Sequence, residues 1–171
     1  KTIKFFNKYL NTPNQFIRVM PNMPAMINEG MTCMYANQYV VKKNIKIVNY
    51  LFLKVGKNLW LKKYSDINKV TAISGSGPGY VFLFIDAFEK AAKQLNLNEE
   101  VIKGLINQTF LGSIKLLLED NTKASVLAKN IAVKGGTTEA ALNNFYAKDI
   151  LHKTFVKVIQ SAFFKAKELG K

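Results

Sequence analysis

The sequence has a single cysteine and a single histidine among its 171 residues. Because Cys33 is alone, an internal disulfide is excluded, and an intracellular, cytoplasmic setting fits this count. A structural zinc site of the usual kind needs several cysteine or histidine ligands, so we expect no metal site. Cys33 and His152 also lie in unrelated contexts, which gives no sign of a Cys–His or Ser–His relay. We expect His152 on the surface of a C-terminal helix.

Arginine is almost absent as well, since Arg18 is the only one among 25 basic residues. With 11 acidic residues the formal net charge is +14, which raises the question of nucleic-acid binding. Bidentate recognition of bases and phosphates favours arginine, however, and the lysines are scattered along the chain. We therefore expect no nucleic-acid partner, and a basic nucleic-acid module is disfavoured.

Three further features are missing. The longest apolar run, residues 80–85, ends at Asp86 and is too short to cross a bilayer, so we expect no membrane partner. The first residues show neither an initiating methionine nor a secretory pattern and are interpreted as a truncated start. No G-x-G-x-x-G follows a strand, because the glycines at 75, 77 and 79 have the wrong spacing and follow a helical segment. We expect the phosphate-binding half of a dinucleotide site to be absent from these residues.

The pattern of apolar side chains predicts two parts. Residues 1–64 alternate short helices and strands: helix 1–10, strands 16–20 and 30–36, helix 40–54 and strand 58–61, with a break at 11–14. From residue 65 onward the pattern is helical: 66–73, 78–95, 99–118, 123–130, 137–144 and 148–169. The few strands predict the closing edge of an α/β domain, with a boundary near residues 62–65.

The helix predicted over residues 78–95 is apolar nearly all round. Such a helix has to be buried on all sides, and a domain of this size rarely supplies that cover. We expect a second copy of the chain to supply it.

Residues 74–80, the glycine corner, hold glycine or proline at four of seven positions. They predict a sharp corner followed by a helix with a free N-terminus, with Ser76 as its cap and Pro78 in its first turn. Composition alone favours an ordinary helix–turn–helix junction without a functional role.

Two other segments are candidates for binding. The first, residues 20–24, follows a strand, where ligands of α/β domains bind. Asn22 would meet a nicotinamide or orient the loop there; from spacing alone a rigid proline-bounded turn capped by Asn22 is favoured. In residues 131–138, Gly135 and Gly136 precede a helix start, where free N–H groups suit a carboxylate. The alternative is Thr138 as a plain N-cap.

Several stretches together resemble one family. Residues 71–81 are similar to the signature segment of pyrroline-5-carboxylate reductases, and residues 18–25, 29–32, 55–57 and 135–138 match the same family in the same order. The resemblance covers nearly the whole chain and corresponds to the C-terminal part of that family. It implies a mainly α fold, in which residues 65–171 form an all-helical substrate-binding and dimerisation domain. Residues 1–64 would be the remainder of a Rossmann-like dinucleotide-binding domain.

The activity that this resemblance implies is hydride transfer from NADPH or NADH to the C=N bond of 1-pyrroline-5-carboxylate, a cyclic imino acid. The product is L-proline, and the reaction is the last step of proline biosynthesis. The family forms homodimers or higher homo-oligomers. The choice between the two cofactors is not revealed, because the residues that read the ribose lie in the missing region.

The resemblance also implies the site residues. The substrate would contact Val133, Lys134, Gly135, Gly136, Thr137 and Thr138, with the catalytic hydroxyl of Thr138 facing the ring nitrogen. The cofactor would lie beside Met20, Pro21, Asn22 and Pro24. Two departures from the family pattern are Met23 in place of threonine, and Val133 and Lys134 in place of Ser-Pro. The alternative function is a non-catalytic helical dimerisation fragment, either a split-gene remnant or a subunit that needs a separate nucleotide-binding partner.

Overall fold

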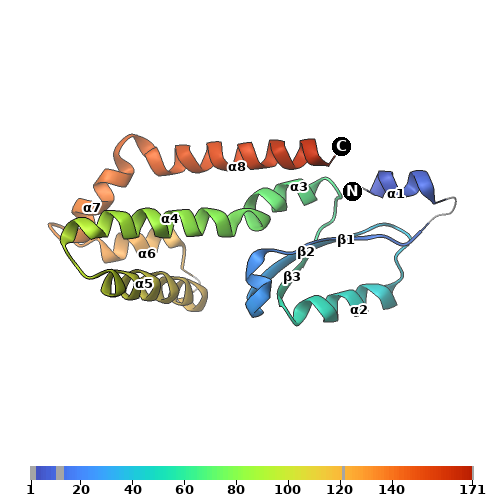
Figure 1. The fold of residues 1–171 in the computed structure, drawn as a ribbon, viewed down its shortest axis with the longest axis horizontal. Helices are drawn as coiled ribbons and strands as arrows, with labels where there is room; N and C mark the ends of the chain where they lie inside the picture. Colours follow the sequence, from blue (N-terminus) through green and yellow to red (C-terminus); the bar gives the residue numbers. More distant parts are fainter. Residues whose placement is uncertain (1–2, 11–13, 121, 171) are drawn as a thin grey trace. The chain divides into compact units, whose positions relative to one another are not determined.

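Figure 1 shows the computed structural model of the chain, which describes residues 3–10, 14–120 and 122–170. The elements cluster into two units, one formed by residues 1–80 with 157–171 and the other by residues 81–156. Most of the break expected at 11–14, and the first two residues of the first predicted helix, lie outside the described residues.

The first unit is built on a sheet of three strands in the order β1 (Ile17–Met20), β2 (Gly30–Ala36) and β3 (Gly56–Trp60). β1 and β2 are antiparallel, with Ile17 opposite Ala36, whereas β2 and β3 are parallel. Thr32, Cys33 and Met34 in the middle of β2 are buried, which explains its nearly continuous run of apolar residues. The core of this unit therefore lies on the central strand.

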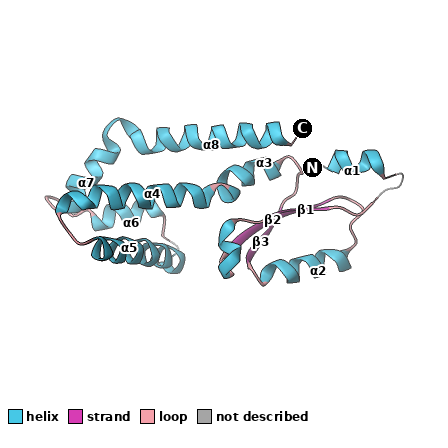
Figure 2. Cartoon of the chain, viewed as in Figure 1, coloured by secondary structure: helices cyan, strands magenta, loops and turns pink. Residues whose placement is uncertain are grey.

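Helix α2 (Lys42–Leu53) connects the two parallel strands and packs on β3 (Figure 2). A parallel pair requires such a crossover. Asn49 ties the helix to the strand: its backbone carbonyl accepts a hydrogen bond from Asn58 Nδ2 at 2.8 Å, and its Oδ1 accepts one from Trp60 Nε1 at 3.0 Å. At the N-terminal end, α1 (Ile3–Tyr9) stacks the ring of Phe6 on that of Phe16 at 5.9 Å.

The segment after β1 contains a short 3-10 helix, η1 (Met23–Ile27), which packs on β2. The sequence pattern did not predict it, because five residues with Pro24 among them and Pro21 just before them resemble a loop. Pro24 fits the first turn of η1, where its missing N–H is not needed. η1 ends at Asn28, whose φ of 64° is left-handed.

The chain stays helical through the glycine corner. α3 (Asp66–Val70) runs into a π-helical turn, η2 (Thr71–Gly75), and α4 (Gly77–Ala92) follows at once. Ser76 has right-handed helical dihedral angles, and its N–H donates to the Thr71 carbonyl at 2.8 Å. The prediction of a corner followed by a free helix N-terminus capped by Ser76 is therefore wrong. The small residues permit a widened turn instead of a break.

The second unit is helical. It contains most of α4, then η3 (Lys93–Leu95), α5 (Glu99–Asp120), α6 (Ala124–Ile131), α7 (Thr137–Tyr146), η4 (Ala147–Asp149) and the start of α8 (Ile150–Leu169). The ring of Phe110 on α5 contacts Phe84 and Phe88 on α4, with centroids 5.9 and 6.5 Å apart. α8 begins two residues later than predicted, because Lys148 and Asp149 have left-handed φ angles of 59° and 54°.

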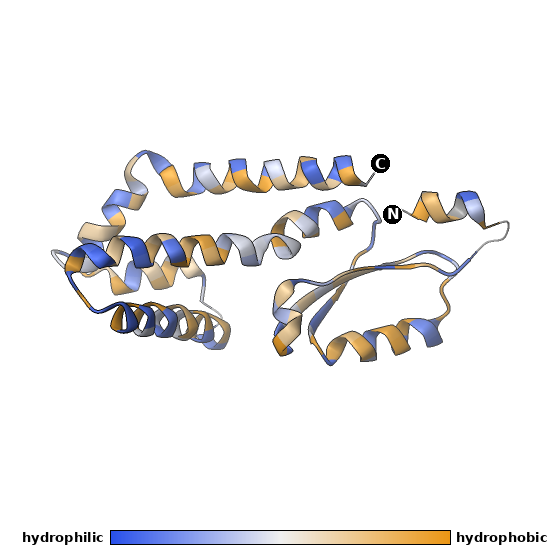
Figure 3. Ribbon diagram, in the orientation of Figure 1, coloured by the Kyte–Doolittle hydropathy of each residue, from blue (hydrophilic) through white to orange (hydrophobic). Residues whose placement is uncertain are grey.

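Hydrophobic residues occur along the helices of this unit (Figure 3). Most of their large apolar side chains are exposed. Among its described residues only Ile102 and Ile106 are buried, whereas Phe82 is 55% and Leu83 69% exposed. α5 is long and apolar enough to cross a membrane by length and composition alone, and 11% of its most apolar window is buried within the chain. A unit with two buried side chains has too small a core to be stable without further cover.

Candidate functional site

The clearest candidate site is the turn before α7, residues 133–138, which we call the glycine–threonine turn. Gly135 has φ 77°, a left-handed conformation that favours glycine. Gly136 is the N-cap of α7. A Cβ atom added there would lie 2.9 Å from Val133 Cγ2 and 3.0 Å from the Val133 carbonyl oxygen. Each glycine is thus required for a different reason, one for its backbone angle and the other for space.

Both glycines use their own N–H groups inside the chain. Gly136 donates to the Val133 carbonyl at 2.9 Å, and Gly135 donates to Glu139 Oε2 at 2.8 Å. The first N–H groups of a helix have no acceptor within it. Among the described residues, no acceptor bonds to the N–H groups of Thr137 and Thr138 at the start of α7, which are therefore available as donors.

The role of Glu139 was missed in the sequence analysis. A glutamate three residues after a helix N-cap is the usual signal for a side chain that reaches back to a backbone N–H. Here the N-cap is Gly136. The carboxylate of Glu139 accepts a hydrogen bond from the N–H of Gly135, the residue before the N-cap. This contact fixes the turn from the helix side.

Thr138 is half-buried and is the second residue of α7. The alternative that it is the N-cap is wrong, because Gly136 has that position and no side chain caps the helix. No described residue makes a hydrogen bond with the Thr138 hydroxyl, which leaves it able to bind a ligand. Val133, Lys134 and Thr137 are exposed beside it.

The second group of predicted residues is the post-strand loop, residues 20–24. Asn22 Oδ1 accepts a hydrogen bond from the Met31 N–H at 2.8 Å. Its Nδ2 donates to the Ser74 carbonyl at 3.2 Å and lies 3.5 Å from Ser74 Oγ. Because both ends of the amide are engaged within the chain, the geometry favours a loop-orienting role of Asn22 over a nicotinamide contact.

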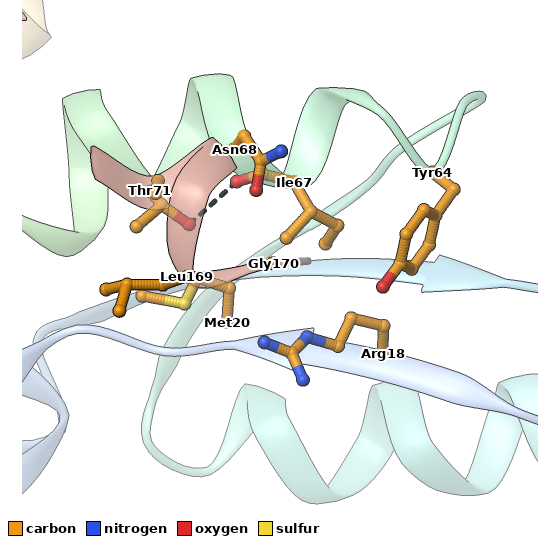
Figure 4. Close-up of a pocket in the computed structure, with 9 residues that line it drawn as sticks. Arg18, Met20, Tyr64, Ile67, Asn68, Thr71, Leu169 and Gly170 are labelled. Carbon is orange, nitrogen blue, oxygen red and sulfur yellow. Dashed lines mark hydrogen bonds between the residues drawn. The ribbon is translucent and has the colours of Figure 1, made fainter. Parts of the chain in front are cut away.

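A cavity of about 230 Å³ lies beside this loop in the first unit (Figure 4). Its walls come from β1, from α3 and the residues next to it, and from the end of α8: Arg18, Met20, Tyr64, Ile67, Asn68, Thr71, Ala166, Leu169 and Gly170. Thr71 Oγ1 donates to the Ile67 carbonyl at 2.7 Å. Of the predicted site residues, Met20 alone lines this cavity, and the glycine–threonine turn belongs to the other unit.

The altered pKa values lie outside both groups of predicted site residues. Burial raises the pKa of the Cys33 thiol on β2. The pKa of Glu99 is lowered by a hydrogen bond from Lys93 and by the charges of Lys93 and Lys103. Within the described ranges no cluster of three His, Cys, Asp or Glu side chains could hold a metal ion. The groups that the candidate site offers to a ligand are therefore backbone N–H groups and hydroxyl groups.

Comparison with known proteins gives a consistent result. Residues 64–169 match the family model described as "Pyrroline-5-carboxylate reductase dimerisation". A pyrroline-5-carboxylate reductase of Pasteurella multocida is 36% identical over 84% of this chain and 52% of its own length. One of Haemophilus influenzae is 33% identical over 95% of this chain and 60% of its length. The chain thus spans about half to three fifths of these relatives.

Solved structures match over nearly the whole chain. A pyrroline-5-carboxylate reductase from Coxiella burnetii has a TM-score of 0.92 at 34% identity, covering 99% of this chain and 63% of that one. The Plasmodium falciparum pyrroline carboxylate reductase with NADP bound has a TM-score of 0.91 at 30% identity, covering 99% and 68%. The mainly helical fold with a small N-terminal sheet, predicted from the sequence, is confirmed.

Proposed function

Because the chain belongs to the pyrroline-5-carboxylate reductase family, we propose that it supplies the substrate-binding and dimerisation part of such an oxidoreductase. The reaction is hydride transfer from NADPH or NADH to the C=N carbon of 1-pyrroline-5-carboxylate. The ring nitrogen gains a proton and L-proline results, which places the reaction at the end of proline biosynthesis. The observation that carries this proposal is the glycine–threonine turn with its unused donors.

In this proposal, the substrate binds at residues 133–138. Its carboxylate accepts hydrogen bonds from the N–H groups of Thr137 and Thr138 at the positive end of α7. Gly135 and Gly136 give the turn its shape, and the exposed cation of Lys134 attracts the same carboxylate. Val133 forms an apolar edge beside the ring.

The catalytic donor is the hydroxyl of Thr138. It donates a hydrogen bond to the ring nitrogen, where electron density grows as hydride reaches the neighbouring carbon. A donor that is already aimed at developing charge lowers the barrier without reorganisation. No described residue uses this hydroxyl in the free chain, which supports the assignment.

The cofactor lies beside the post-strand loop, against Met20, Pro21 and Pro24, with Asn22 orienting the loop, and when bound it supplies the hydride. The relative with NADP bound supports a nicotinamide cofactor. These 171 residues hold no G-x-G-x-x-G after a strand, so the pyrophosphate has to be bound by a separate segment. Residues 1–64 are then the remainder of the dinucleotide-binding domain, and residues 65–171 the helical domain.

The partner for the exposed helices is a second copy of the chain, in a cytoplasmic homodimer or higher homo-oligomer. The support is the family model, which describes dimerisation, together with the exposed apolar residues of the second unit. The second candidate function is a helical dimerisation fragment without catalysis. It is favoured by Val133 and Lys134, which replace the Ser-Pro of the family and remove a hydroxyl from the turn.

In a protein whose residues 1–171 are joined to a G-x-G-x-x-G nucleotide-binding domain, reductase activity distinguishes the two functions, and substitution of Thr138 tests its catalytic role. We expect Thr138→Val to lower the turnover number by roughly 100-fold, as for the loss of one aimed donor. Thr138→Ser keeps the hydroxyl and most of the activity. A Thr138→Val protein that is folded and turns over at nearly the original rate would refute the catalytic role.

A further inference from the structure

The glycine corner, residues 74–80, has no part in the proposed reaction, yet its contacts are specific. Ser74 accepts the hydrogen bond from Asn22 Nδ2 through its backbone carbonyl, and Gly75 lies against Met20. All of these residues belong to the first unit. The start of the corner is therefore in contact with the post-strand loop.

The three glycines of the corner differ in their surroundings. A Cβ atom added to Gly75 would lie 2.6 Å from Met20 Cε, so Met20 would have to move. Atoms added to Gly77 or Gly79 would meet nothing within 4 Å. The close approach of Met20 thus explains why position 75 needs a glycine. Gly77 and Gly79, which have space for a side chain, serve as controls for substitutions at Gly75.

The π-helical turn places the carbonyl of Ser74 where Asn22 of the post-strand loop can donate to it. Its hydrogen bond from the Ser76 N–H to the Thr71 carbonyl spans five residues. Such a widened turn displaces carbonyl groups from the regular helical pattern, and these need other donors. The Tyr80 hydroxyl donates to the Ala72 carbonyl at 3.1 Å, and Asn22 Nδ2 donates to that of Ser74.

We propose that Asn22 is a positioning residue that fixes the post-strand loop on the π-helical turn, so that loop and turn move as one body. Its Oδ1 holds the N–H of Met31 at the beginning of β2, and its Nδ2 holds Ser74. One amide thus joins the post-strand loop to the start of β2, nine residues further along, and to the π-helical turn, 52 residues further along. This inference rests on the proposed function in one respect, which is that the loop borders the cofactor. Asn22 affects cofactor binding only by fixing the position of the loop.

Asn37 provides a matched control at the other end of the β1–β2 pair. Its Oδ1 accepts from the Phe16 N–H at 3.1 Å, and its Nδ2 donates to the Asn14 carbonyl at 2.8 Å. Asn37→Ala therefore removes both kinds of hydrogen bond, one more than Asn22→Asp, without touching the turn. Asn22→Asp keeps an acceptor for Met31 and loses the donor to Ser74.

The first experiment uses residues 1–171 and needs no activity. We expect Asn22→Asp to shift the backbone amide NMR signals of residues 72–76 and to add microsecond-to-millisecond motion there, whereas Asn37→Ala leaves these signals in place. Unchanged signals and dynamics at residues 72–76 in a folded Asn22→Asp chain would overturn the proposal.

A double-mutant cycle tests the same junction from its other side and replaces the first experiment if Asn22→Asp does not fold. Gly75→Ala should lower the folding equilibrium constant about tenfold, and much less in a Met20→Ala background, because the side chain that must move is gone. Gly77→Ala should have the same small effect in both backgrounds. Additive effects of Gly75→Ala and Met20→Ala on the free energy of unfolding would contradict the proposal that the loop and the turn are packed together.

The functional consequence is measured in the protein joined to a nucleotide-binding domain. Asn22→Asp should raise the KM for the reduced cofactor about tenfold, as for one lost hydrogen bond, while Asn37→Ala leaves it unchanged. If the joined protein lacks reductase activity altogether, the proposed function fails. The NMR result still decides whether Asn22 fixes the loop, and the cycle still decides whether loop and turn are packed together. Equal KM values for the Asn22→Asp and Asn37→Ala proteins would show that the junction does not position the cofactor.

Discussion

Cys33 shows how strongly the fold controls the chemistry of a single residue. It lies in the middle of β2, is 2% exposed, and has a raised pKa because burial disfavours the thiolate. The thiolate is the reactive form of cysteine, so the folded chain holds its one thiol in an unreactive state. The protonated thiol also links stability to pH. Because its pKa is higher in the folded state, its contribution is complete below the unfolded pKa and is lost as pH rises through the folded one.

We predict that the folded chain is alkylated at Cys33 far more slowly than the unfolded chain at the same mildly alkaline pH. Mass spectrometry after timed exposure to a thiol reagent, with and without denaturant, measures the two rates. Rapid labelling of the chain without denaturant would contradict the burial of Cys33. In addition, the free energy of unfolding should fall as pH rises above the pKa of an unfolded cysteine, about 8.5.

At the candidate site, local sequence determines the position of the turn but not its role. Two glycines before a helix start indicate a turn there, and the structure forms one at Gly135 and Gly136. Its binding of a carboxylate stays a prediction. The partners of Asn22 could not be predicted, because Met31 and Ser74 are joined to it by the tertiary fold. The N-cap interpretation of Thr138 is wrong because the helix starts at Thr137, as the apolar pattern predicts, so that Gly136 is the N-cap.

At the scale of elements, periodicity predicted most helices and strands. The strand at 30–36 was placed correctly, and α2, α5 and α8 lie within a few residues of the predicted bounds. The glycine corner is the exception, since glycine and proline usually end a helix. Here the π-helical turn is held by hydrogen bonds from Asn22 and Tyr80, which the local pattern does not contain.

The turn before α7 gives a prediction at this scale. Gly135→Ala should lower the free energy of unfolding by about 1–2 kcal/mol, because φ 77° is unfavourable for a residue with a Cβ atom. Gly135→Asn should cost less, since asparagine tolerates the left-handed region. Chemical denaturation of the two variants measures both effects. Equal losses for alanine and asparagine would mean that crowding, not the backbone angle, determines this position.

At the scale of the whole molecule, the feature that needs an explanation is exposed apolar surface. The second unit buries only Ile102 and Ile106 among its described residues, and the membrane-length helix α5 is mostly exposed. A second copy of the chain covers such surface in the proposed dimer. Since the association is apolar, added salt should not weaken it.

We predict that sedimentation at low micromolar concentration shows no monomer, at low or at high salt, because the folded protomer is not stable alone. A well-folded monomer would contradict the dimer. Material that stays in solution only with detergent would instead favour a membrane role for α5.

The measurement that tests the central claim most directly is proline formation from 1-pyrroline-5-carboxylate and NADPH. Residues 1–171 alone should show negligible activity and at most weak cofactor binding, because the pyrophosphate-binding loop is not among them. The same residues joined to a G-x-G-x-x-G nucleotide-binding domain should form L-proline. Robust activity of residues 1–171 alone, or no proline from a joined protein that binds NADPH, would contradict the account.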